Sequence, residues 1–153
     1  GNYIVADMKL SELDPNQIDW LVFPGADKTE EAVNLGEGLK DMVKNHWNNG
    51  GNIAAICAAP ALVLGPIGII NGTEATGYPF LKEEFEMNGG IYSEAPVVVG
   101  DRLITSKGPG TTLEFALAIV RKAKGEETER ALREGMVVGC CDCNDNCTCG
   151  CNS

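Results

Sequence analysis

The stretch Ala54-Ala55-Ile56-Cys57-Ala58-Ala59-Pro60 decides how the rest of the chain is interpreted. The apolar run that ends at Ile56 has the composition of a short buried strand, and a single cysteine follows it directly. A second apolar run, over residues 61–70, then predicts a helix. A strand that turns sharply into a helix at a cysteine is a nucleophile elbow, where the helix N-terminus favours a thiolate over a thiol. The alternative is a free cysteine that packs as a small hydrophobic residue.

The totals of the sequence limit the classes of protein to consider. With 153 residues, one domain is the natural expectation, and 44% hydrophobic residues suit a packed core. The net charge of −10 argues against binding to nucleic acid or to an anionic membrane surface. No apolar stretch is long enough to span a bilayer, and the first residues lack the basic region of a signal peptide. We therefore expect a cytoplasmic protein.

The segments around the elbow alternate between strand and helix patterns, which predicts an α/β fold with a mostly parallel sheet. Strands are expected at 3–6, 18–23 and 52–56, and 96–99 and 102–105 flank a tight turn at Gly100-Asp101. The run 18–23 is apolar and expected to be buried. Helices are expected at 35–47, 61–70, 78–85, 113–123 and 126–133. The helix at 113–123 is apolar nearly all round and should be buried under the sheet or in a subunit contact, whereas 126–133 should be solvated.

Active sites in parallel α/β sheets lie beyond the carboxyl ends of the strands. Three loops are expected to meet there: 24–27, 57–59 and the glycine-rich 106–112. The backbone N–H groups of Ala26 and Ala58 could then face the Cys57 sulfur as an oxyanion hole.

Four segments together resemble the ThiJ/PfpI superfamily, and among its branches the DJ-one group with its bacterial YajL-like and deglycase members. These segments are IDWLVFPGA (18–26), IAAICAAP (53–60), ATGYP (75–79) and LITSKGPGTTLEFALA (103–118). The resemblance runs in register from residue 1 to residue 138. It implies a flavodoxin-like three-layer sandwich of the class I glutamine amidotransferase type, usually a homodimer.

The resemblance also implies a site and a reaction. Cys57 is the nucleophile, Ala26 and Ala58 supply the oxyanion-hole N–H groups, and Gly25 and Tyr78 lie beside them. Family activities include glyoxalase III-type conversion of methylglyoxal to lactate, deglycation of its adducts, redox-linked chaperoning and, in one branch, peptidase activity. The chemistry requires no metal and no organic cofactor. We therefore expect an enzyme acting on a 2-oxoaldehyde or a glycated substrate, and the alternative is a redox-sensing or chaperone-like stress protein.

The chain departs from the family pattern at its start. The family usually opens with a strand–helix–strand unit whose helix carries a glutamate that hydrogen-bonds the cysteine and moves protons. The present sequence matches the family only after that unit, so the glutamate has no counterpart in these 153 residues. The unit is a separate fragment of the same protein, or the sequence is incomplete, or the activity has been lost; we favour the first two explanations.

A second departure concerns the catalytic histidine that some branches have where this chain has Tyr78. The single histidine, His46, falls late in the helix predicted at 35–47, and we expect it on the solvated surface. Without a Cys–His pair the peptidase activity is disfavoured. Tyr78 could still donate a hydrogen bond near the thiolate.

The end of the chain is unusual, and six of the seven cysteines lie in it: Cys140, Cys141, Cys143, Cys147, Cys149 and Cys151. Their spacing resembles thiolate clusters that bind soft metals such as zinc or Cu(I). The alternative, which we favour, is a disordered tail without a dedicated ligand, because the paired C-x-x-C spacing of a zinc finger is absent. The expected organisation is one domain over 1–138 and a cysteine-rich tail over 139–153.

Overall fold

The computed structural model describes residues 3, 5–9, 12–14, 17–25 and 37–138. The chain divides into two compact units, Gly1–Ala116 and Leu117–Ser153. The predicted boundary at residue 138 and the cysteine-rich tail fall at or outside the end of the described residues, so that division stays a prediction.

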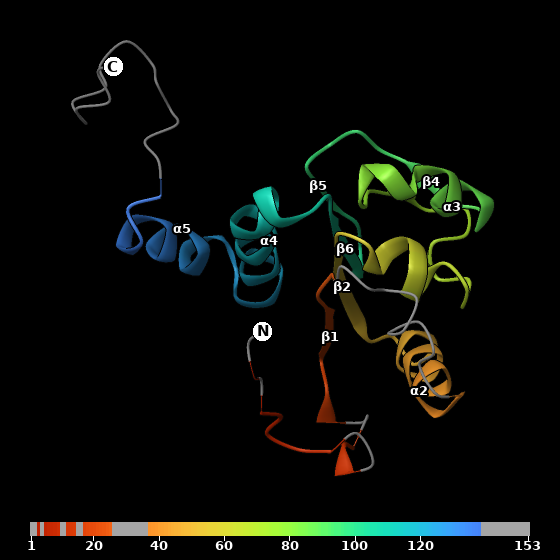
Figure 1. Ribbon diagram of the computed structural model, residues 1–153. Coiled ribbons are helices and arrows are strands. Elements are labelled where there is room, and N and C mark those ends of the chain that lie inside the picture. Colours follow the sequence, from red (N-terminus) through yellow and green to blue (C-terminus); the bar gives the residue numbers. More distant parts are fainter. Residues whose placement is uncertain (1–2, 4, 10–11, 15–16, 26–36, 139–153) are drawn as a thin grey trace. The chain divides into compact units, whose positions relative to one another are not determined.

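The first unit is built on a four-stranded sheet in the order β1-β2-β6-β5 (Figure 1). Its strands are β1 (Trp20–Phe23), β2 (Asn52–Ile56), β5 (Val97–Val99) and β6 (Leu103–Ser106). β1, β2 and β6 run parallel, and β5 pairs antiparallel with β6 across the turn predicted at Gly100. This mixed, mostly parallel sheet confirms the α/β fold expected from the sequence.

The core lies against the two inner strands. Every residue of β6 is buried, as are the last four of β2, whereas the side chains of β1 are only partly covered. Helix α2 (Glu37–Asn48) contributes Val43, which is fully buried. The apolar positions that predicted this helix also pack here: Leu39, Met42 and Trp47 lie against the core, which includes Ile53, Ala55 and Leu103.

A smaller layer follows the elbow. Strands β3 (Glu74–Ala75) and β4 (Ile91–Tyr92) form a two-stranded parallel sheet. Between them the chain makes a single 3-10 turn, η4 (Pro79–Leu81), and a short helix, α3 (Lys82–Met87). Phe85 of α3 is buried and meets Tyr92 edge-on, with ring centroids 5.5 Å apart. This contact fixes the segment that carries Tyr78.

Two helices close the described chain, α4 (Thr112–Lys124) and α5 (Glu126–Gly135). Residues 112–116 of α4 belong to the first unit and the rest to the second. The prediction that 113–123 is buried under the sheet is wrong in part, because Phe115 and Leu117 are buried but Leu113 is 44% exposed; burial in a subunit contact stays a prediction. Alternate burial of this kind is what a helix produces when only one face meets the core. α5 is solvated as predicted, apart from Glu129, which pairs with Arg133 at 2.9 Å.

Two strand predictions need correction. The described residues of 3–6 form no strand, and Tyr3 and Val5 are exposed to solvent. β1 forms as predicted but is not buried, because Val22 is 50% exposed. The reason is positional: β1 pairs with β2 on one side, and no described strand pairs with its other side.

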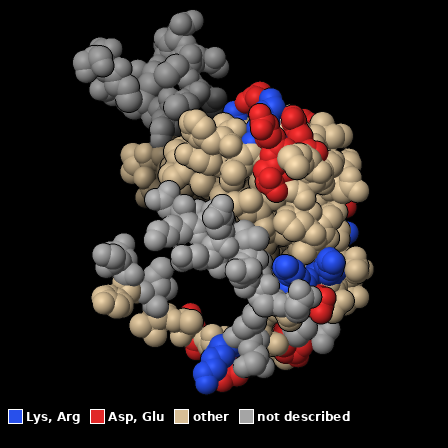
Figure 2. All heavy atoms as spheres, turned by 45° about the vertical axis from the view of Figure 1, so that its right-hand side comes forward, with Lys and Arg blue, Asp and Glu red and all other residues tan. Residues whose placement is uncertain are grey.

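Among the described residues, no helix has the length and apolar content that crossing a membrane would require. The face in Figure 2 is mostly uncharged, with acidic and basic side chains gathered together along part of its upper edge.

Candidate active site

Cys57 lies directly after β2 and adopts a conformation that is rare for its residue type. Its φ angle is +64°, in the left-handed region where side chains other than glycine are disfavoured. Two backbone hydrogen bonds hold it there. The Cys57 N–H donates to the Ser106 carbonyl at 2.9 Å, and the Cys57 carbonyl accepts from the Tyr78 N–H at 2.7 Å. Such conformations cluster at functional sites and persist only where the surroundings enforce them. This geometry is what a nucleophile elbow requires.

Gly25 brings the end of β1 up against the cysteine. A Cβ atom at position 25 would lie 2.4 Å from the Cys57 Cβ and 3.0 Å from its Sγ, closer than atoms can pack. The approach follows from the sheet, because β1 and β2 are paired in parallel with Phe23 opposite Ala55. Only a residue without a side chain therefore fits beside the thiol.

Of the two expected oxyanion-hole donors, only Ala58 lies among the described residues. Ala58 follows Cys57 at a buried position, 3% exposed, so its N–H belongs to the elbow itself. Ala26 lies outside the described residues. The oxyanion hole formed by both N–H groups stays a prediction.

The helix after the elbow is shorter than predicted. Instead of 61–70, it comprises only η3 (Pro60–Leu64), a π-helical turn closed by a hydrogen bond from the Gly65 N–H to the Pro60 carbonyl at 3.0 Å. Turns follow over 65–70, where Pro66 has no N–H to continue the helix and Gly68 has a φ of +81°. The segment that follows the cysteine is therefore a single helical turn rather than the predicted helix.

Tyr78 is joined to the elbow through its backbone rather than through its ring. The preceding Gly77 is buried, and a Cβ there would lie 3.3 Å from the Cys57 carbonyl oxygen. The Tyr92 hydroxyl donates to the Gly77 carbonyl at 2.9 Å and so ties this loop to β4. The Tyr78 side chain is 37% exposed. A hydrogen bond from its hydroxyl to Cys57 stays a prediction.

The glycine-rich loop supplies the third side of the elbow. Ser106 is fully buried, and its hydroxyl donates to the Pro96 carbonyl at 3.2 Å. The Thr111 hydroxyl accepts from the Gly108 N–H at 3.2 Å, which folds the loop back on itself. Sequence reasoning located this loop but did not assign the Ser106 and Tyr78 backbones as supports of Cys57. The signal available was that both belong to the motifs SKGPG and ATGYP.

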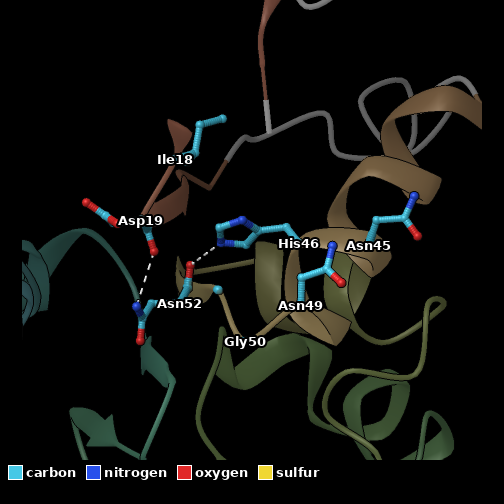
Figure 3. A pocket seen from close by; sticks show the side chains of 8 residues that line it. Ile18, Asp19, Asn45, His46, Asn49, Gly50 and Asn52 are labelled. Carbon is cyan, nitrogen blue, oxygen red and sulfur yellow. Dashed lines mark hydrogen bonds between the residues drawn. The ribbon is translucent and has the colours of Figure 1, made fainter. Parts of the chain in front are cut away.

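The expectation for His46 is wrong. It is 5% exposed, and its Nε2 lies 3.0 Å from the Asn52 carbonyl, as Figure 3 shows. It lines a polar pocket of about 280 Å³ with Asp19, Asn45 and Asn49. The pocket lies at the amino end of β2, whereas Cys57 follows the carboxyl end, so His46 is no base for the cysteine.

The metal site suggested by the six tail cysteines stays a prediction. Over the part of the chain that the structure describes, no group of three or more His, Cys, Asp or Glu side chains could hold a metal ion. The six tail cysteines lie outside that part. Cys57 is a free thiol.

A cysteine held in a strained turn at the carboxyl edge of a parallel sheet is typical of α/β proteins with a nucleophile elbow. Residues 1–122 match the DJ-1/PfpI family, and the chain belongs to this family. This confirms the resemblance to the ThiJ/PfpI superfamily and to its DJ-one branch.

Known relatives agree in sequence and in fold. Protein DJ-1 homolog B of Arabidopsis thaliana is 41% identical over 88% of this chain. The glutathione-independent glyoxalase DJR-1.2 of Caenorhabditis elegans is 38% identical over 86% of this chain. The crystal structure of Drosophila melanogaster DJ-1beta is 34% identical and superposes with a TM-score of 0.81 over 89% of this chain. The fold is thus the flavodoxin-like fold of the class I glutamine amidotransferase type.

The chain spans only part of these relatives. It covers 30% of the Arabidopsis DJ-1 homolog B and 32% of the Arabidopsis DJ-1 homolog A. It covers 69% of the Caenorhabditis protein and 73% of the Drosophila structure.

Proposed function

We propose that the protein is a cysteine-dependent enzyme of the glyoxalase III or protein deglycase type, acting on methylglyoxal or its adducts through Cys57. The observation that carries this proposal is the pinned left-handed conformation of Cys57, whose Sγ lies beside the side-chain-free Gly25. A family relative that is a glutathione-independent glyoxalase supports it. The third support is the convergence on Cys57 of three segments: Gly25 after β1, Tyr78 after β3, and Ser106 at the end of β6.

The proposed reaction begins when the Cys57 thiolate adds to the aldehyde carbon of a 2-oxoaldehyde. The N–H groups of Ala58 and Ala26 stabilise the oxyanion of the resulting hemithioacetal. A carboxylate then moves the proton from the former aldehyde carbon to the neighbouring carbon, so that a thioester and a hydroxyl group form together. Water hydrolyses the thioester, releases a 2-hydroxy acid and regenerates the thiol. The carboxylate has no counterpart in these 153 residues and is assigned to the family's N-terminal unit.

The test is conversion of methylglyoxal to lactate by the 153-residue chain, alone and with the N-terminal unit of a relative supplied as a second polypeptide. We expect turnover with the added unit and its loss in Cys57→Ser. A variant with all six tail cysteines changed to serine is the control, because it removes other thiols and leaves Cys57. If Cys57→Ser keeps the parent rate, the proposed mechanism is wrong.

A second candidate function is a redox-sensing or chaperone-like role, which is compatible with the partial exposure of Cys57. A sensor needs only an accessible, oxidisable thiol, and Cys57 is partly exposed. Mass spectrometry after mild peroxide distinguishes the two functions. Addition of two oxygens at Cys57 in a protein without turnover supports the sensor, whereas turnover with the added unit supports the enzyme.

The partners that we propose follow from the same reasoning. The small-molecule partner is a 2-oxoaldehyde or a glycated substrate. The macromolecular partner is a second copy of the chain or a separate N-terminal fragment of the same protein, since β1 pairs on only one side among the described strands.

A further inference from the structure

Two aromatic side chains stand in solvent beside the elbow. Phe80 is 86% exposed and Tyr78 is 37% exposed, and their ring centroids lie 5.3 Å apart at an interplanar angle of 47°. We call this pair the aromatic rim. A phenylalanine exposed to this degree gains nothing from core packing, yet its ring is held in contact with a second ring. Together the two rings offer an apolar surface with the tilted geometry that aromatic groups prefer.

The rim is fixed relative to Cys57 through the backbone. The Tyr78 N–H donates to the Cys57 carbonyl at 2.7 Å, so the rim begins at a residue bonded to the elbow. On its other side the Tyr78 ring lies next to the glycine-rich loop, since a Cβ at Gly108 would be 3.8 Å from the Tyr78 Cδ2. Pro79 separates the two aromatic residues and begins a 3-10 turn, which limits the freedom of Phe80. The rim is therefore joined to the elbow at its first residue and bounded by the glycine-rich loop.

We propose that the aromatic rim binds the substituent of the substrate and selects aryl-substituted 2-oxoaldehydes over methylglyoxal. This inference rests on the proposed function and deepens it by naming the substrate class. The aldehyde carbon bonds to the Cys57 sulfur while the aryl group packs on Phe80 and Tyr78. A methyl substituent is too short to reach both rings, so it gains little from them. Tyr78 and Phe80 act as specificity-determining residues, and the covalent chemistry remains that of Cys57.

The experiment measures alkylation of Cys57, which does not depend on turnover. N-phenylmaleimide and N-ethylmaleimide carry the same reactive group. The thiolate adds to the carbon–carbon double bond, a sulfur–carbon bond forms, and solvent supplies a proton to the neighbouring carbon. The protein is the full chain with its six tail cysteines changed to serine, and mass spectrometry follows Cys57. Dividing the phenyl-to-ethyl rate ratio by that of glutathione removes the difference in intrinsic reactivity.

We expect the corrected ratio to exceed one in the parent protein and to fall by about 2- to 10-fold in Phe80→Ala, the fold-change that corresponds to one aromatic contact. Phe80→Tyr should keep the preference because it keeps the ring. Met87→Ala is the matched control, since Met87 is 82% exposed on the following helix and lies outside the rim. An unchanged ratio in Phe80→Ala, or an equal loss in Met87→Ala, overturns the proposal.

A second measurement separates this proposal from the proposed function. With the N-terminal unit supplied, Phe80→Ala should raise the KM for phenylglyoxal by a larger factor than the KM for methylglyoxal. If the parent protein shows the aryl preference in alkylation but converts neither substrate, the rim stands and the enzyme proposal fails. If it converts both substrates and Phe80→Ala changes neither KM, the enzyme stands and the rim is refuted.

Discussion

Gly25 is the residue on which the position of Cys57 most directly depends. An alanine methyl group at position 25 would have to displace the cysteine side chain, because the space it needs is occupied by the Cys57 Cβ and Sγ. We expect Gly25→Ala to lower the free energy of unfolding by about 1–3 kcal/mol through overpacking. Alkylation of Cys57 should slow by roughly tenfold or more, since the alanine methyl group displaces the cysteine side chain from its position.

The matched control for this change is Gly38→Ala. Gly38 lies in α2 and has no atom near its Cβ position, so alanine there should raise stability by about 0.5–1 kcal/mol. Chemical denaturation and the rate of iodoacetamide alkylation measure both quantities. A Gly25→Ala protein with parental alkylation and stability would show that the close approach at Cys57 is unimportant.

Glu94 makes the folding stability of the chain depend slightly on pH in the acid range. Its carboxylate lies 3.0 Å from the Lys107 ammonium group and 3.2 Å from that of Lys82. These bonds, the Lys107 bond above all, lower the pKa of Glu94 below its ordinary value of 4.5. A lowered pKa means that the charged form of Glu94 is favoured in the folded protein. The stabilisation that Glu94 contributes to the fold is therefore fully present above pH 4.5, and it is lost as the pH falls through the lower pKa of the folded state.

We therefore expect Glu94→Gln to be less stable than the parent at pH 7 and equally stable once both are measured well below that pKa. The difference should be small because the pair is exposed, and salt should reduce it further. Lys107→Gln should reproduce more of the loss than Lys82→Gln. Denaturation midpoints over a pH series check this, and a difference that grows toward acid pH would contradict it.

At the level of single residues, the sequence located the reactive cysteine but not the burial of His46. Cys57 is marked by local features, namely an apolar run before it and small residues after it. The burial of His46 depends instead on a tertiary contact, since the ring packs against Gly51 and meets the Asn52 carbonyl. A helical pattern carries no information about which polar side chain will find such a partner.

Among the elements, α2 is joined to β6 by one side chain. Arg102 precedes β6 and donates from the same guanidinium nitrogen to the Trp47 carbonyl at 2.7 Å and the Gly51 carbonyl at 3.1 Å. The guanidinium carbon also lies 4.1 Å from the centroid of the Trp47 ring. The arginine thus satisfies carbonyls at the end of α2 and stacks on its last aromatic residue.

Arg102→Lys keeps the charge but removes the planar group that stacks on Trp47 and bonds both carbonyls. We expect it to lower the free energy of unfolding by about 1–3 kcal/mol. Arg130→Lys, at an exposed position on α5, should change it by less than about 0.5 kcal/mol. Urea denaturation measures both, and equal effects would mean that the Arg102 contacts contribute nothing specific.

Elements whose bounds follow from a strong local sequence pattern were predicted well. Elements whose formation depends on interrupting residues or on a partner strand were not. β2 has the predicted bounds because its apolar run stops abruptly at the cysteine. The predicted helix at 61–70 reduces to η3 because Gly65 and Pro66 interrupt it, although the residues on either side are apolar. Residues 3–6 have the composition of a strand, but a strand also needs a partner. None of the described strands pairs with them.

For the whole molecule, the feature with the widest consequences is the side of β1 that no described strand pairs with. β1 presents backbone groups on that side, and Val22 leaves half of its side chain in solvent. An edge strand with apolar side chains is a template for pairing with another strand. The 153 residues cover 73% of the Drosophila DJ-1beta structure, so the relative contains chain that could occupy this edge.

If a second copy or a separate fragment pairs with β1, a charge on that strand should oppose the pairing. Lysine at an edge position has to be desolvated when a neighbouring strand arrives, so Val22→Lys should weaken association by about tenfold or more. Sedimentation velocity over a concentration series measures association of the chain with itself, and titration with the N-terminal unit of a relative measures the other case. Val5→Lys is the control, because Val5 is 90% exposed and belongs to no strand. Association that Val22→Lys leaves intact would place the contact elsewhere. Loss of binding to the N-terminal unit with unchanged self-association would assign the β1 edge to the fragment rather than to a second copy.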